Sequence, residues 1–358
     1  MAVNVILYND SYYKTLVNQD NGEIKDNLGE RGEDFQKILI DILENDYPEI
    51  SYLNYSNKFI INFEPEVELS IYEKKSGDLS EVRCRVSIMI TKESRLPLDE
   101  IEFIVNKLNQ NSELSYRLEN NGRDILISRE EKILDSGSLI AGANYIIQLI
   151  CLLHSTLVDE IKERDDIKES LNIQPSEIIT KSRNLLWDES ITVNDIIDEI
   201  IYLKNFLIPK KFKHFFQYKK INSNIVEIYM PLRKDNIVCK QTVGLVLNPS
   251  NYRNEGMLIV TELKNDLTDL KKSREFVAKL NSGSGNNTNL NREAVGSWIT
   301  TDDKDLAIIY KIYIPNLVIK NTQLSEIILK SIREIIYGNE ELEIEKKFLR
   351  AKNSVNII

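Results

Sequence analysis

One segment of the chain combines cationic and aromatic side chains: residues 210–220 have the sequence Lys-Lys-Phe-Lys-His-Phe-Phe-Gln-Tyr-Lys-Lys. Such a segment can stack bases and hold phosphates, or it can bind an acidic peptide. It can also be a strand or linker whose aromatic rings join the core while its lysines stay in water. The net charge of −10 disfavours nucleic acid, because phosphate binding needs a concentrated positive field. We favour the structural interpretation and keep a partner-binding patch of Lys210, Lys211 and Lys213 as the functional alternative.

Two arginines, Arg83 and Arg85, share one face of a predicted strand. They alternate with apolar residues, so they lie opposite the predicted core. They can pair with Glu66 and Glu68 across the sheet, or they can offer donors to a partner. Pairing is favoured, and both arginines stay tentative partner-binding residues. Trp298 joins them, because it either packs in the core or lines a peptide groove.

The sequence contains no catalytic or metal-binding signature. The two histidines, His154 and His214, are far apart, and the three cysteines form no CxxC pair. The segment 282–285 (Ser-Gly-Ser-Gly) lacks the Gly-Lys-Ser/Thr ending of a phosphate-binding P-loop. The acidic segment 301–305 lacks the glycine and distal glutamate of a calcium loop. We therefore predict a non-enzymatic protein without a cofactor or a metal.

The elements that carry these residues repeat along the chain. At an offset of 172, the segments 98–109 and 270–281 share five identical residues, and both end in Lys-Leu-Asn. The helices predicted at 33–45 and 193–206 have the same apolar spacing of i, i+3, i+4, i+7 and i+8. We therefore predict a duplicated module. The identical pairs are Leu98 and Leu270, Val105 and Val277, Lys107 and Lys279, Leu108 and Leu280, and Asn109 and Asn281.

Strict alternation of apolar and polar residues, for example over residues 82–90, predicts antiparallel sheets with one buried and one wetter face. The predicted class is α+β, with two tandem modules of order α-β-β-β-α-β-β-α. The predicted segments are an N-terminal arm (1–32), module 1 (33–163), a helical connector (164–191), module 2 (192–338), and a charged C-terminal helix with a tail (339–358).

One uncharged stretch, residues 136–158, has about the length of a membrane span. Its more polar side chains fall along one stripe, which favours a helix packed on protein along a broad apolar face. We predict a buried helix and no membrane association. The N-terminus lacks the basic region of a signal peptide, so the expected location is the cytoplasm. The stripe consists of Asn144, Gln148, Cys151 and Ser155.

This order of elements resembles the chaperones of type III secretion systems and the related YbjN-like proteins. The resemblance rests on the Lys-Leu-Asn helix ends at Asn109 and Asn281, on the hairpin that follows each, and on the closing helices after residues 135–137 and 314–316. It implies an α+β sheet that binds an extended peptide or partner segment, often in a helix-mediated dimer. It carries no catalytic residues. A tandem pair departs from the single module of these chaperones, so a homodimer and an internal pseudo-dimer both stay open.

The expected function is recognition of a protein or peptide partner by a chaperone-like or adaptor protein, through an exposed sheet edge or a groove between sheet and helix. The alternative is an accessory scaffold or sensor subunit of a multi-protein bacterial system, defence included.

Overall fold

The structure is a computed structural model of the 358-residue chain. Its two compact units are an N-terminal unit, Asn21–Asp188 with Leu317–Thr322, and a C-terminal unit, Glu189–Asn316 and Gln323–Ile358. The predicted connector falls almost wholly outside the described residues. Those are residues 23–25, 28–76, 79–133, 138–163, 191–208, 210, 213, 216–234, 237–252, 255–264, 267, 269–282, 296–301, 307–321 and 324–355.

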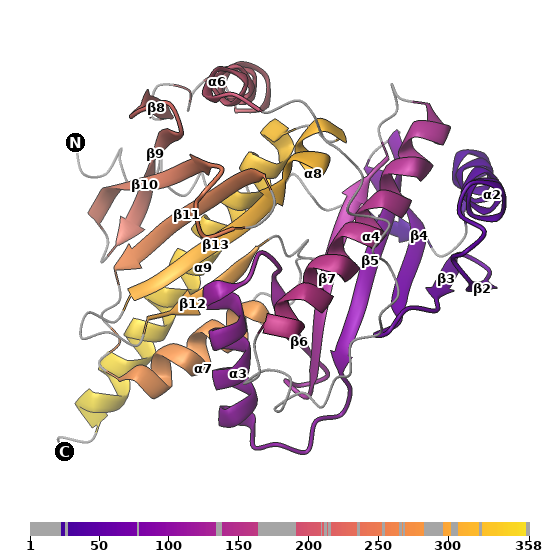
Figure 1. Cartoon of the computed structure of the whole chain (residues 1–358). Coiled ribbons are helices and arrows are strands. Elements are labelled where there is room, and N and C mark those ends of the chain that lie inside the picture. Colours follow the sequence, from indigo (N-terminus) through magenta and orange to yellow (C-terminus); the bar gives the residue numbers. More distant parts are fainter. Residues whose placement is uncertain are drawn as a thin grey trace. The chain divides into compact units, whose positions relative to one another are not determined.

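The N-terminal unit is built on an antiparallel sheet with the strand order β2-β3-β4-β5-β7-β6, and the short β1 pairs with the far end of β4. Helices α2 and α4 pack together on one face of this sheet (Figure 1). The elements are β1 (Glu23–Lys25), α2 (Glu30–Asn45), β2 (Tyr52–Tyr55), β3 (Lys58–Ile61), β4 (Val67–Ser76), β5 (Leu79–Thr91), α3 (Leu98–Asn111), β6 (Tyr116–Glu119), β7 (Asp124–Lys132) and α4 (Leu139–Glu163).

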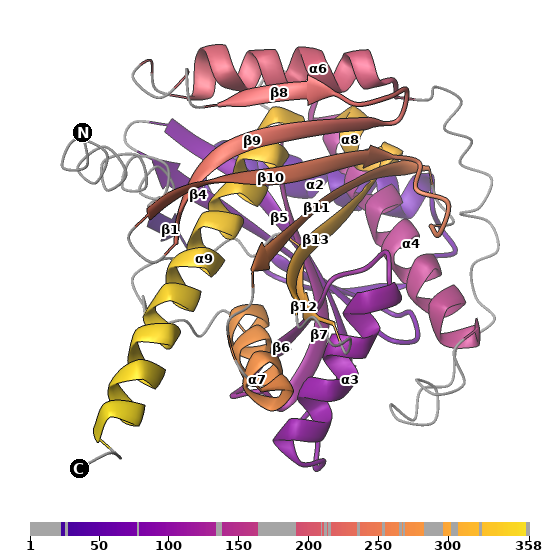
Figure 2. The same ribbon diagram turned by 90° about the vertical axis from the view of Figure 1, so that its left-hand side faces the viewer.

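The C-terminal unit contains a second antiparallel sheet, with the strand order β8-β9-β10-β11-β13-β12 (Figure 2). Its elements are α6 (Val193–Tyr202), the π-helix η3 (Leu203–Leu207), β8 (Gln217–Lys220), β9 (Ile225–Lys234), β10 (Ile237–Leu247), β11 (Gly256–Lys264), α7 (Leu270–Asn281), β12 (Ser297–Thr300), β13 (Ala307–Pro315) and α9 (Leu324–Val355). The short helix α8 (Asn316–Asn321) follows β13 and, apart from Asn316, belongs to the N-terminal unit.

The two sheets have the same topology, since β2 to β7 and β8 to β13 occupy the same places in order. The predicted α+β class with antiparallel sheets in tandem is therefore confirmed. The predicted order lacks β2 and β8, and in the N-terminal unit it also lacks the short β1. Strands β2 and β8 have four residues each and are mostly exposed, so they lack the apolar alternation that marks a half-buried strand.

The buried faces of both units follow the predicted patterns. In the N-terminal unit, Phe35 and Leu39 of α2 and Ile71 and Cys84 of the sheet are fully buried. In the C-terminal unit, Ile196 and Ile200 of α6 are fully buried as well. Six strand residues of the C-terminal sheet are also fully buried: Val226, Ile228, Leu245, Ile259, Ile308 and Ile314. Apolar burial on one face of each sheet thus stabilises both units.

Helix α4 is long and apolar enough to cross a bilayer, and it is the one such helix among the described residues. It packs against α2 and β5, and Ile146, Leu149 and Leu157 are fully buried. The predicted polar stripe lies on its less buried side, apart from Cys151. The helix therefore has the packing of a core helix.

The start of α6 has the signal that the sequence predicts, whereas the division predicted near Gly338 is absent. A capping box begins α6: Thr192 Oγ1 accepts a hydrogen bond from the Asp195 N–H, and the Asp195 carboxylate accepts one from the Thr192 N–H. The sequence suggested a closing helix followed by a separate charged helix near Gly338. The structure instead has one continuous helix α9 through this glycine. Because Gly338 has no Cβ, the ring of Trp298 can approach the helix closely there.

Candidate functional site

The repeated Lys-Leu-Asn endings of α3 and α7 have the same role in both units. The Asn109 amide donates to the Tyr116 carbonyl at 2.9 Å, and its Oδ1 accepts the Tyr116 N–H at 2.8 Å. Asn281 makes the same pair of bonds with Trp298, both at 2.8 Å. Both asparagines are buried, so each satisfies two backbone groups that would otherwise be costly to bury.

These asparagines lie at the end of each sheet. Tyr116 is in β6 and Trp298 is in β12, and both strands are terminal in the strand order. Tyr116 pairs with Ile127 of β7, but its N–H and carbonyl bond Asn109, so they point away from β7. The asparagine side chain therefore takes the place that a further strand would occupy. We call this end of each sheet the closed edge.

The opposite end of each sheet is different. Within the described part of the chain, no strand pairs with the outer side of β2 or β8. On β2, Leu53 and Tyr55 point to the same face and are 49% and 61% exposed. On β8, Lys219 and Lys220 are exposed. We call β2 and β8 the open edges.

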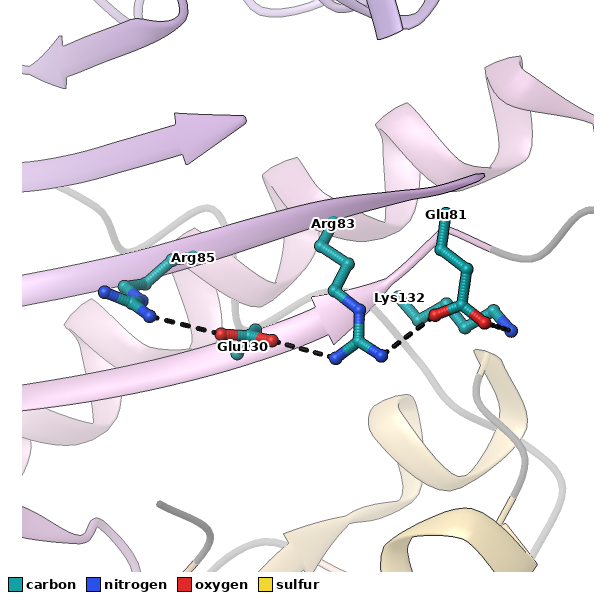
Figure 3. Close-up of polar contacts among 5 residues, drawn as sticks. All are labelled: Glu81, Arg83, Arg85, Glu130 and Lys132. Carbon is teal, nitrogen blue, oxygen red and sulfur yellow. Dashed lines mark hydrogen bonds and ion pairs between the residues drawn. The ribbon is translucent and has the colours of Figure 1, made fainter. Parts of the chain in front are cut away.

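The predicted arginines lie in a row of alternating charges on the N-terminal sheet (Figure 3). Arg83 contacts both Glu81 and Glu130 at 2.9 Å, Arg85 reaches Glu130 at 3.3 Å, and Lys132 reaches Glu81 at 2.7 Å. Burial would raise the pKa of Glu81, but hydrogen bonds from Lys132 and Arg83 hold it below its ordinary value. Glu81 is therefore held in its charged form.

The partners of the arginines differ from the predicted ones. Register places Arg85 beside Ser70 and Arg83 beside Tyr72, so neither side chain lies beside Glu66 or Glu68. The Glu68 carboxylate instead pairs with Lys58 at 3.1 Å.

The side chains of Arg83 and Arg85 also differ in their exposure to solvent. The Arg83 side chain is 7% exposed, which disfavours direct contact with a partner. The Arg85 side chain is 49% exposed and lies over the Tyr72 ring. Burial, followed by the Glu130 carboxylate, raises the pKa of Tyr72.

Trp298 lies in the core of the C-terminal unit. It is 1% exposed, its ring contacts Tyr310 at a centroid distance of 5.1 Å, and Gly338 of α9 lies against its six-membered ring. A partner cannot reach this ring in the folded unit, so the core-packing alternative describes it.

The basic, aromatic segment divides between structure and surface. Lys210 is exposed, whereas the Lys213 ammonium donates to the Asn205 carbonyl at 2.5 Å, where it caps the C-terminal end of η3. Phe216 is buried, as the structural interpretation predicts. Lys211 lies outside the described residues.

Two further ionisable groups are buried without a catalytic partner. His154 packs on the Phe63 ring, its Nε2 bonds the Glu64 carbonyl at 2.9 Å, and burial lowers its pKa. The Cys151 thiol has a pKa raised by burial to about 11, which makes it a poor nucleophile. Among the described residues, no three His, Cys, Asp or Glu side chains gather in a way that could hold a metal ion.

Glu160 near the end of α4 holds the loop after α3. Its carboxylate accepts from the Ser112 hydroxyl at 2.6 Å, from the Glu113 N–H at 2.9 Å and from the Tyr116 hydroxyl at 3.0 Å. Burial raises its pKa, although these hydrogen bonds oppose the change. Tyr116 is thus fixed at its backbone by Asn109 and at its hydroxyl by Glu160.

Arg123, in the turn between β6 and β7, donates to the carbonyls of Ser94 and Leu96 at 3.2 and 2.6 Å and thereby holds the loop before α3.

Comparison with known proteins yields no relatives: no protein-family model, curated protein or solved structure matches the chain.

Proposed function

We propose that this chain is a non-enzymatic, chaperone-like or adaptor protein that accepts an extended segment of a partner protein on an open sheet edge. One observation carries the proposal. Each sheet is closed at one end by a buried asparagine and ends on the other side in a short, mostly exposed strand. Exposed edges pair readily with other chains, so proteins usually protect them. Among the residues that the structure describes, this protection occurs at one edge of each sheet.

The β2 edge has the groups that strand addition needs. The Asn62 N–H bonds the Ser51 carbonyl at 3.0 Å. Backbone bonds alternate along antiparallel strands. The backbone N–H and carbonyl groups of Leu53 and Tyr55 therefore face β3, while the N–H groups of Tyr52 and Asn54 point outward. Outward N–H and carbonyl groups supply affinity in strand addition, and alternate side chains supply specificity. Leu53 and Tyr55 offer an apolar and an aromatic contact beside that edge.

The second candidate function is an accessory scaffold or sensor subunit of a multi-protein bacterial system. The presence of two matched open edges on one chain favours it. A chain that holds two segments raises the effective concentration of one near the other. An adaptor and a scaffold differ here in the number of segments bound at once.

The resemblance to type III secretion chaperones and YbjN-like proteins agrees with peptide binding, and membership of that group stays a prediction. The cytoplasmic location and the absence of nucleic-acid and membrane partners are proposals of the same kind.

Photo-crosslinking from a defined strand position tests the main proposal. A benzoylphenylalanine replaces Tyr55 in the full chain expressed in its native host, and cross-linked segments are mapped by mass spectrometry. The expected result is one recurrent partner segment, captured from Tyr55 but not from the same probe at the exposed Phe348 of α9.

The matched pair Asn54→Pro and Asn54→Ala tests the backbone contribution. Proline removes the outward N–H, so it should abolish the crosslink, whereas alanine should keep it. Equal capture from Tyr55 and Phe348, or a crosslink that Asn54→Pro leaves unchanged, would overturn the edge mechanism.

A further inference from the structure

The open edge of the C-terminal unit lies in a segment that has no negative charge. Residues 200–226 contain six lysines and neither aspartate nor glutamate, although the whole chain carries a net charge of −10. Exposed lysines on an otherwise acidic protein attract an acidic partner and repel a basic one.

The described lysines of this segment lie on and beside β8. Lys219 and Lys220 belong to the strand and are exposed, and Lys210 is exposed shortly before it. The Lys220 ammonium lies 3.5 Å from the Asn194 side chain, at the edge of hydrogen-bond range, so this contact holds it weakly. Lys219 faces Glu227 across the β8–β9 pair. The two side chains point to opposite faces of the strand, Lys219 beside Glu227 and Lys220 near Asn194, so Lys220 is the cation with less local neutralisation.

Exposed aromatic residues lie next to this basic segment. The rings of Tyr202 and Phe206 contact each other at a centroid distance of 4.9 Å, and Phe206 is 72% exposed. Both are at the π-helix η3, whose Asn205 carbonyl binds Lys213. That hydrogen bond joins the aromatic pair to the lysine-rich segment. π-Helical turns are frequent at functional sites.

The backbone of β8 is oriented to accept a strand. The Ile221 N–H bonds the Ile225 carbonyl at 2.9 Å. Backbone bonds alternate along an antiparallel pair. The backbone N–H and carbonyl groups of Gln217 and Lys219 therefore face β9, and the N–H groups of Tyr218 and Lys220 point outward. Cations and outward N–H groups therefore occur on the same four-residue strand.

We propose that the open edge of β8 binds an extended, acidic segment of a partner protein, with Lys220 recognising carboxylates on one face of that segment and Lys219 recognising those on the opposite face. This inference rests on the proposed edge function and adds the charge of the ligand. Tyr202 and Phe206 supply an apolar contact beyond the strand. A neutral or basic segment gains the backbone bonds without the charge pairs.

Fluorescence anisotropy with the full chain tests the proposal. The probes are a labelled alternating Glu–Val peptide, the matching Gln–Val peptide and a single-stranded oligonucleotide. We expect the Glu–Val peptide to bind about tenfold more tightly than the Gln–Val peptide and to weaken as salt increases. Equal binding of the two peptides, absence of Glu–Val binding, or tighter binding of the oligonucleotide would overturn acidic-peptide recognition.

Variants at Lys220 separate strand addition at the β8 edge from recognition of the acidic side chains. Lys220→Gln removes the charge, whereas Lys220→Pro also removes the outward N–H. Lys220→Gln should weaken Glu–Val binding about threefold and leave Gln–Val binding unchanged, and Lys220→Pro should weaken both peptides further. The exposed Lys37→Gln on α2 is the control and should change neither.

The outcomes are distinguishable. If Lys220→Pro weakens both peptides while Lys220→Gln changes neither, the edge function stands and the charge recognition fails. If Lys220→Pro and Lys220→Gln bind both peptides equally well, the edge function fails at β8. Thermal unfolding of each variant shows whether it is folded, and the comparison of the two peptides on the unmodified chain does not depend on any variant.

Discussion

The Asn109 side chain is hydrogen-bonded at both ends to the backbone of one residue, Tyr116, on the terminal strand of its sheet. Asn281 holds Trp298 in the same way, at the matching place of the second unit. Because these asparagines end the twelve-residue sequence repeat, the repeat preserves a structural contact as well as a helix.

Asn109→Leu should destabilise the N-terminal unit by about 2–4 kcal/mol, because it leaves a buried N–H and a buried carbonyl of Tyr116 without partners. Urea unfolding measures the loss. The exposed Asn111→Ala on the same helix is the control and should change little. Asn109→Asp keeps the acceptor but at neutral pH buries a carboxylate beside the Tyr116 carbonyl, so its effect should be at least as large. A neutral Asn109→Leu would contradict this role.

Gly338→Ala should destabilise the C-terminal unit, although alanine favours helices by about 1 kcal/mol over glycine. An added Cβ would overlap the Trp298 indole, and overpacking of this kind costs about 1–3 kcal/mol. The sign of the change in unfolding free energy therefore decides between the two effects. A Trp298→Phe background, with a smaller ring, should reduce the cost of Gly338→Ala. A stabilised Gly338→Ala single variant would show that helix and ring are not in contact.

Arg83→Ala should be far more damaging than Arg85→Ala. Loss of Arg83 leaves the Glu81 and Glu130 carboxylates without their shared, nearly buried cation, and breaking a buried pair costs about 3–5 kcal/mol. Arg85 is half exposed and makes one longer contact with Glu130, so its removal should cost about 1 kcal/mol or less. Chemical denaturation of both variants provides the comparison. Equal losses would show that burial does not distinguish the two arginines.

Glu160→Gln should change the pH dependence of stability. The native pKa of Glu160 is raised above its ordinary value of 4.5 by burial. The folded state therefore binds the proton more tightly than the unfolded state, and this contribution is complete below pH 4.5 and is lost as the pH rises through the native pKa. Glutamine cannot ionise. The stability of the wild type relative to Glu160→Gln should therefore fall from pH 4 to pH 7, as measured by urea unfolding at each pH. A constant or rising difference would contradict the sign.

Much of the fold can be predicted from the sequence, because buried strands and helices follow the periodicity of their apolar residues. The strands around Cys84 and Ile228 are examples. β2 and β8 could not be predicted in this way, because an exposed edge strand buries too little to impose alternation. In β8 the lysines concealed the strand, although Tyr218 and Lys220 continue the face of Ile228 and Val226.

The candidate sites were harder to predict, because they depend on register. Arg83 and Arg85 were identified correctly as one face of a strand. Their partner Glu130 lies on β7, beyond α3 and β6, and no local pattern joins it to the arginines. The repeat pointed to Asn109 and Asn281, but their bonds to Tyr116 and Trp298 follow from where each helix ends relative to its hairpin.

The closed edges also affect self-association. Fibrils grow by a continuous sheet that adds strands at both of its ends. In each unit an asparagine amide already occupies one end of the sheet, so strands can be added at the other end alone. A second copy of the chain that paired edge to edge would complete the sheet and stop its growth. The same asparagines that stabilise each unit therefore limit each sheet to a terminated pair, although the open edges β2 and β8 let one chain pair with two others.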